Sequence, residues 1–219
     1  MTTYKFTELS DDIVRKLARL QVAPLIPEKW DQMRMALTTH EHQQIAAINL
    51  TLRNKKVTLM NEATIWSRAI YPLLVLAEAP GSQAWSEVAM TAHYPNFSLE
   101  GIVDGVIASE ELGKVAAPYL IVTETKRGFE AKEPTYQMLG EMLAAAWINY
   151  QNDHKSEQLI YGCYTIADTW TFAEGVVTEF DAEHPHFTVQ VSNEYKEINE
   201  AETIFQILKS IVAKFTQTP

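Results

Sequence analysis

The sequence predicts a mixed α/β protein in which a mixed central sheet is flanked by helices. Short runs rich in β-branched residues lie in the middle of the chain, and apolar residues recur at helical spacing before, between and after them. No internal repeat or low-complexity linker divides the sequence. A chain of 219 residues is long enough for one well-packed core with an added segment.

Residues 1–58 are expected to form an N-terminal helical segment. The first helix follows an N-cap at Ser10 or Asp11 and is broken by Pro24. A second helix is predicted over residues 39–52, where apolar residues again recur at helical spacing.

Residues 59–219 are expected to hold the core and a C-terminal extension of strands and a helix, packed as one compact unit. Each predicted strand is a short run rich in β-branched or aromatic residues, and each predicted helix carries an apolar face. In order, the pattern predicts a helix over 63–78 bent at Pro72, strands over 88–93, 98–108 and 119–125, a helix over 133–149, strands over 159–166, 170–177 and 187–191, and a closing helix over 200–215.

The composition is typical of a globular protein without a membrane segment. Charged residues make up 21% of the chain, and no apolar run approaches the length of about 20 residues that crosses a bilayer. The N-terminus is rich in charged side chains and has no apolar stretch of the kind found in signal peptides. A single cysteine, Cys163, excludes an internal disulfide. We therefore expect a cytoplasmic protein that does not bind membranes.

The net charge of −10 argues against a protein that coats nucleic acid through a general positive field. It does not exclude a nuclease, because a site that holds a divalent cation is itself acidic. If nucleic acid is the substrate, the basic residues must be concentrated locally, supplied by a protein partner, or both. The sequence has two basic clusters. One contains Arg53, Lys55 and Lys56, and the other contains Lys126, Arg127 and Lys132. The first cluster is equally typical of a solvated loop.

Two carboxylates and a lysine interrupt the apolar strands in the middle of the chain. Side chains alternate between the two faces of a strand, so Glu124 and Lys126 point the same way. Asp104 interrupts the preceding strand and can lie beside Glu124 if the two strands are neighbours. Buried charges of this kind are costly unless they are paired or bind a metal. Adjacent carboxylates favour a shared proton or a hard cation such as Mg²⁺, and a nearby ammonium would stabilise the transition state of phosphodiester hydrolysis.

Asp104 followed by Glu124-Thr125-Lys126 resembles the motif of the PD-(D/E)XK nuclease superfamily, although Val103 stands where many members have proline. The resemblance covers roughly residues 60–165 and implies the restriction-endonuclease-like αβββαβ core. It also implies that Glu62 on the preceding helix assists metal binding, that the backbone carbonyl of Thr125 joins the metal shell, and that Gln137 matches a polar residue on the helix after the Glu-x-Lys strand in RecB-like members.

The expected function is Mg²⁺-dependent hydrolysis of phosphodiester bonds, with DNA as the substrate and Mn²⁺ able to replace Mg²⁺. Many relatives act as dimers, and a two-fold homodimer would bring two centres to two strands. The expected catalytic residues are Asp104, Glu124, Lys126 and Gln137, and the expected metal ligands are Glu62, Asp104, Glu124 and Thr125.

Two alternatives belong to other classes of protein. One is a catalytically inactive member of the same fold that serves as a binding or assembly module; the strong acidity favours it and the intact Asp-Glu-Lys set opposes it. The other is an unrelated α/β protein in which these three residues form an ion network without a catalytic role. Core packing explains the tryptophans at 66, 85, 147 and 170 better than a base-stacking surface does.

Overall fold

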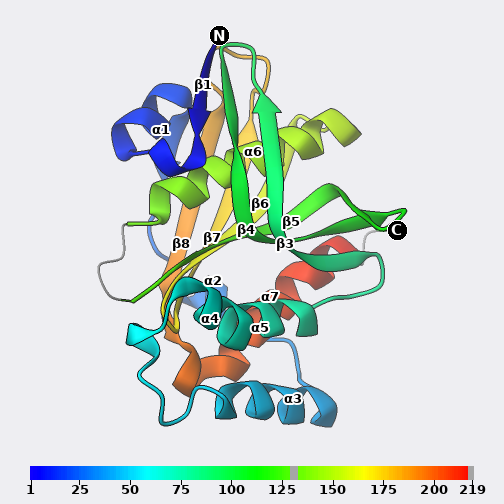
Figure 1. Ribbon diagram of the computed structural model, residues 1–219. Coiled ribbons are helices and arrows are strands. Elements are labelled where there is room, and N and C mark those ends of the chain that lie inside the picture. The colour runs from blue at the N-terminus through cyan, green and yellow to red at the C-terminus, as the bar shows by residue number, and fades with distance from the viewer. Residues whose placement is uncertain (129–132, 217–219) are drawn as a thin grey trace.

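The fold is a curled mixed sheet with helices on both faces, which confirms the predicted mixed α/β class (Figure 1). The computed structural model describes residues 1–128 and 133–216. Within these residues, no helix combines the length and the apolar character needed to cross a membrane.

The sheet has eight strands in the described part of the chain. The pairs β1/β4, β5/β6 and β2/β8 are parallel, and the remaining neighbours are antiparallel. The strands run in the order β1-β4-β5-β6-β7-β8-β2, with β3 also paired to β4. They are β1 (Thr2–Lys5), β2 (Arg19–Val22), β3 (Ser82–His93), β4 (Phe97–Glu111), β5 (Lys114–Lys126), β6 (Glu157–Ile166), β7 (Thr169–Thr178) and β8 (His186–Lys196).

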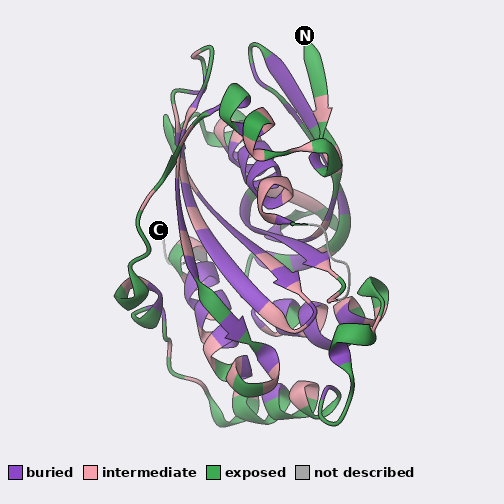
Figure 2. Cartoon of the chain, turned by 90° about the vertical axis from the view of Figure 1, so that its left-hand side faces the viewer, coloured by how far each residue is buried: buried purple, intermediate pink, exposed green. Residues whose placement is uncertain are grey.

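Two hydrophobic cores lie on the two sides of the sheet. Neighbouring strand residues alternate between them: Val122 belongs to the core under α1 and α6, and Ile121 belongs to the core under the other helices. The sheet and α6 are therefore largely buried, whereas α3 contributes one fully buried side chain, Ile45 (Figure 2). The helices are α1 (Asp11–Leu17), α2 (Pro27–Asp31), α3 (Thr39–Leu50), α4 (Glu62–Ile65), α5 (Tyr71–Leu76), α6 (Thr135–Asp153) and α7 (Glu197–Thr216).

The bend expected at Pro72 takes the form of a π-helical turn between α4 and α5. Pro72 has no N–H to donate to the carbonyl of Arg68, which disrupts the regular helical hydrogen bonds. The helix widens over Trp66–Ile70, and the N–H of Tyr71 donates to the carbonyl of Trp66. Such turns occur frequently at functional sites.

The prediction that residues 1–58 are a helical segment is wrong in part. β1 and β2 both come from this segment and join the sheet, β1 beside β4 and β2 beside β8. Each strand has four residues, most of them exposed, so neither carries the alternation of apolar and polar residues that identifies a strand in sequence. Tertiary pairing at the sheet edges determines their conformation instead.

One side chain of α6 completes the hydrogen bonding of β5 where that strand has not yet begun to pair with β6. The buried amide of Asn149 accepts from the N–H of Tyr119 at 2.7 Å and donates to its carbonyl at 2.8 Å. The first β5/β6 pair is Ile121 with Tyr161, so Asn149 continues the row of backbone bonds by two groups. It fixes α6 relative to β5.

We predict that Asn149→Ala lowers the free energy of unfolding by about 2 to 4 kcal/mol, because two buried backbone groups of Tyr119 lose their partners. Urea denaturation measures the change. Asn152→Ala, an exposed substitution near the end of the same helix, is the control and should change stability by less than about 0.5 kcal/mol. Equal effects of the two substitutions would contradict this role of Asn149.

Candidate active site

The β4/β5 pair brings Asp104 beside the Glu124–Lys126 end of β5. The last paired residues of this ladder are Gly105 and Thr123, so Asp104 and Glu124 come directly after the point where backbone pairing stops. Asp104 Oδ2 accepts a hydrogen bond of 2.7 Å from the backbone N–H of Thr125. The carboxylate thus takes the place of a strand partner and is held against β5.

Glu124 is the centre of a buried polar chain that runs from β5 to α6. Its Oε1 accepts from the ammonium of Lys126, on the same face of the strand. On its other side Glu124 is in hydrogen-bonding contact with Glu141 of α6. Gln137, one turn earlier in α6, donates to Glu141 Oε1 at 3.1 Å. Gln137 therefore lies two contacts away from Glu124.

Burial alters the protonation of this chain. Removal from water, and then the charge of Asp104, raise the pKa of Glu124 to about 7 even though Lys126 opposes the shift. Glu141 is completely buried, and burial followed by the charge of Glu124 raises its pKa well above the usual range. Glu124 Oε2 and Glu141 Oε2 have no partner in the described residues while both groups are ionised. A proton on Glu141 removes the conflict, because Glu141 can then donate to Glu124.

The ammonium of Lys126 stays charged in this setting. Burial lowers its pKa, but the bond to Glu124 and the charges of Glu124, Asp104 and Glu62 outweigh that effect, so the pKa is raised overall. The pKa of Asp104 is raised by burial, and the Thr125 N–H and Lys126 partly offset the shift. The site thus holds one fixed positive charge among several carboxyl groups.

An open cavity of about 260 Å³ lies on the outer side of Asp104. Of the predicted site residues, Glu62, Asp104 and Thr125 line this cavity. Glu124, Lys126 and Gln137 are not among its lining residues: Glu124 is fully buried, and Lys126 and Gln137 are partly exposed. Asp104 is therefore the residue that connects the cavity to the buried carboxyl groups. The cavity is lined by Glu62, Ala63, Trp66, Ser86, Glu87, Asp104 and Thr125.

The oxygen donors at this site suit a hard divalent cation such as Mg²⁺. Asp104 and Glu124 are adjacent, and Glu124 Oε2 and Thr125 Oγ1 are buried without partners in the described residues. Across residues 1–128 and 133–216, no three Asp, Glu, His or Cys side chains already converge in a metal-binding arrangement. Holding an ion would require the carboxyl groups of Asp104 and Glu124 to turn toward one another, with water and substrate oxygens as the other ligands.

Three site residues were not identified from the sequence. Glu141 had a readable signal, because it lies four residues after Gln137 in an apolar helix and so shares its face. Glu87 had none: it lines the cavity through a positive φ of 53° in β3, which no sequence pattern indicated. Trp66 was assigned to core packing; it does pack against a hydrophobic core, but it is only partly buried and also lines the cavity.

Comparison with known proteins adds no assignment. No model of a known protein family matches this sequence, and no curated protein matches it. The function is therefore inferred from the fold and the geometry of this site.

We predict that Glu141→Gln makes stability less dependent on pH. A carboxyl whose pKa is raised by folding contributes stability below its ordinary pKa, and this contribution is lost as the pH rises toward the raised value. Glutamine keeps a donor for Glu124 and an acceptor for Gln137 but does not titrate. The advantage of the variant over the unmodified protein should therefore grow between pH 5 and pH 8, by at most about 1.4 kcal/mol per pH unit.

Urea unfolding at a series of pH values measures this difference. Glu157→Gln, which changes an exposed carboxyl at the start of β6, is the matched control and should reproduce the unmodified curve. If the stability of Glu141→Gln and of the unmodified protein depended on pH in the same way, folding would not raise the pKa of Glu141.

Proposed function

We propose that this protein is a metal-dependent nuclease of the PD-(D/E)XK type that hydrolyses phosphodiester bonds, with DNA as its substrate. The observation that carries the proposal is the position of Asp104. It bonds to the backbone of the Glu124-Thr125-Lys126 strand and at the same time lines an open cavity. One carboxylate thereby connects a solvent-accessible space to a buried glutamate–lysine pair.

The arrangement of elements around the site supports this proposal. From residue 62 to residue 166 the order is a helix, three strands, a helix and a strand. The three strands β3, β4 and β5 are antiparallel, and β6 returns parallel to β5 after α6. This is the αβββαβ order expected of a restriction-endonuclease-like core, with Asp104 on its second strand and Glu124 on its third.

Each residue of the site has a distinct role in the proposed reaction. Asp104 and Glu124 would hold a Mg²⁺ or Mn²⁺ ion, with Glu62 on the wall of the cavity, and Thr125 would add its carbonyl oxygen. The ion would lower the pKa of a water molecule and neutralise charge on the phosphate. Lys126 keeps its proton and would stabilise the oxygen that attacks phosphorus. Gln137 acts indirectly, since it positions Glu141 against Glu124.

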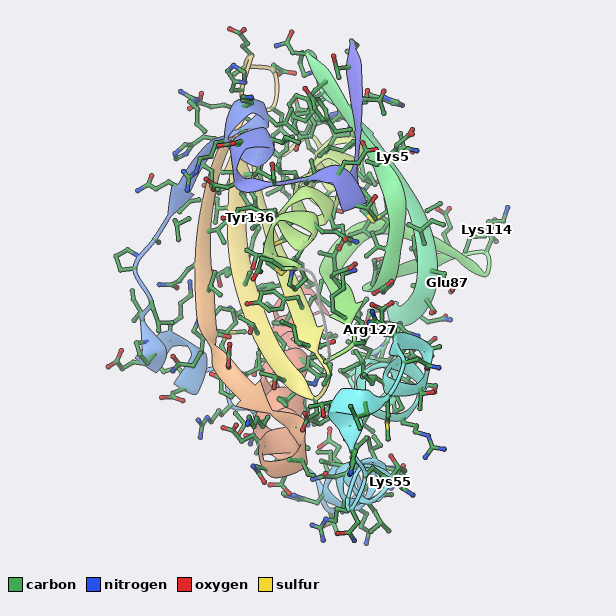
Figure 3. The ribbon with its side chains drawn as sticks, turned by 60° about the vertical axis from the view of Figure 1, so that its left-hand side comes forward. Lys5, Lys55, Glu87, Lys114, Arg127 and Tyr136 are labelled. Atoms are coloured by element: carbon green, nitrogen blue, oxygen red, sulfur yellow. The ribbon has the colours of Figure 1, made fainter. Side chains whose placement is uncertain are left out.

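A substrate with a phosphate backbone needs basic residues near the site, because the net charge of the protein is negative. Thr58 packs against Gly128, since a Cβ on Gly128 would lie 2.9 Å from the Thr58 backbone. The segment after Lys55 and Lys56 therefore reaches the end of β5, which Arg127 follows. In the view of Figure 3, Lys55 lies well below both Arg127 and Glu87. Lys132 lies outside the described residues. A protein partner with a basic surface would supply further positive charge.

A second candidate function is a catalytically inactive module of the same fold. The observation that favours it is the ion pair between Lys126 and Glu124, which occupies a carboxylate oxygen that a metal would otherwise use. The overall negative charge points the same way. Such a protein would retain the carboxyl groups and bind a partner without cleaving DNA.

We predict that the purified protein cleaves DNA only when Mg²⁺ or Mn²⁺ is present. Asp104→Asn and Lys126→Ala should each lower the cleavage rate by at least about 100-fold, because each removes a group that acts on the transition state. Gel assays with single-stranded and double-stranded DNA measure the rate. Glu100→Gln on β4 and Lys114→Ala at the far end of β5 are exposed controls on the same strands.

Metal-dependent cleavage that both variants abolish and both controls retain would support the nuclease. Cleavage that survives Asp104→Asn would point to a contaminating enzyme and contradict the proposal. Absence of cleavage by the unmodified protein, with either metal and either form of DNA, would favour the inactive module.

A further inference from the structure

We infer that Trp66 is a stacking surface for an unpaired nucleobase next to the scissile phosphate, so that the protein prefers single-stranded or locally opened nucleic acid. This inference rests on the proposed nuclease function and specifies its class of substrate. It starts from Trp66, the only aromatic side chain among the described residues that line the cavity at Asp104.

Trp66 and Glu62 reach the cavity from the same helical face. They are four residues apart, across α4 and the first position of the π-helical turn, so their side chains lie one above the other. Asp104 lines the same cavity. A nucleotide whose phosphate lies at Asp104 would thus place its base or a neighbouring base near the indole.

The indole is held in one orientation by three separate contacts. Its Nε1 donates to Ser86 Oγ at 3.0 Å, and Ser86 Oγ lies 3.4 Å from the carbonyl of Asp104. One part of the ring covers Gly105 so closely that a Cβ there would lie 2.3 Å from it. The ring of Tyr71 packs at 5.4 Å between centroids. A ring fixed in this way loses little conformational freedom when a ligand stacks on it.

The chemistry of the cavity favours a base over other ligand groups at this position. Among the described residues, the charged groups that line it are the carboxyl groups of Glu62, Glu87 and Asp104, which repel a phosphate that no cation accompanies. The indole offers a neutral aromatic surface, and every nucleobase has a π-face that can stack on it. Stacking requires a base that is not stacked in a duplex, hence the preference for unpaired nucleic acid.

A purely structural role of Trp66 does not explain why part of its ring lines the cavity. Covering Gly105 requires a large apolar side chain, but it does not require an aromatic ring that is partly exposed to the cavity. The two roles differ in one measurable respect: only stacking depends on the presence of a base in the ligand.

The test is a double-mutant cycle in which the indole of Trp66 and the base of the ligand are each removed, alone and together. Fluorescence anisotropy would measure the binding of a labelled single-stranded DNA oligonucleotide, and of the same oligonucleotide with abasic residues, with Ca²⁺ replacing Mg²⁺ to suppress cleavage. We expect Trp66→Ala to weaken binding of the intact oligonucleotide on the order of 10-fold and to leave binding of the abasic one unchanged. Trp66→Phe, which keeps a ring, should retain most of the affinity. Trp147→Phe, a partly buried tryptophan on α6, is the control.

Equal losses for intact and abasic oligonucleotides would overturn the inference, as would unchanged binding by Trp66→Ala or tighter binding of the duplex. Intact and abasic RNA oligonucleotides, measured in the same way, show whether the protein prefers ribose or deoxyribose. Failure of the unmodified protein to bind either nucleic acid would also overturn the inference. Base-dependent binding without metal-dependent cleavage would instead sustain the role of Trp66 and contradict the nuclease function.

Discussion

The carboxyl groups of Glu124 and Glu141 meet between β5 and α6, with the ammonium of Lys126 bound to Glu124. The structure of the site depends on how the negative charge of these carboxyl groups is balanced. Glu124 and Glu141 are fully buried, and Lys126 supplies one positive charge. Two ionised carboxylates in contact would repel strongly away from water, so one of them holds a proton or the space receives a cation. A pair of apolar side chains would serve stability better than this arrangement. Its presence in the middle of a protein core is therefore the strongest indication that the site has a chemical function.

The fold concentrates these groups through a few local features. The β4/β5 ladder stops at Gly105 and Thr123, which leaves the Thr125 N–H for Asp104 to bind. Helix α6 is apolar over most of its length and packs flat on the sheet, so Glu141 is carried down against Glu124 together with the apolar residues around it. On the other side, the helical segment with the π-helical turn before Pro72 carries Glu62 and Trp66 to the cavity wall. A rigid sheet thus supports the buried part of the site, and a short irregular helix forms its accessible part.

The sequence was informative where the pattern was regular and uninformative where tertiary contacts decide. The alternation of faces along β5 correctly placed Glu124 and Lys126 together, and the long apolar helix and an irregularity of the helix near Pro72 were both predicted. The edge strands β1 and β2 were not, because four exposed residues carry no readable period and acquire their conformation by pairing. Glu87 reaches the cavity through a left-handed backbone conformation in the middle of a strand. The role of Trp66 depends on Gly105 of a distant strand, and a single sequence does not report that contact.

The proposed nuclease requires Asp104 and Glu124 to hold a hard divalent cation, which Mn²⁺ binding measured by electron paramagnetic resonance tests. The titration is made on the whole protein with and without a single-stranded oligonucleotide, since substrate oxygens complete the shell of such ions. We expect a bound Mn²⁺ ion that Asp104→Asn releases and Glu100→Gln retains. Equal Mn²⁺ binding by the two variants, or no binding even with the oligonucleotide present, would contradict it.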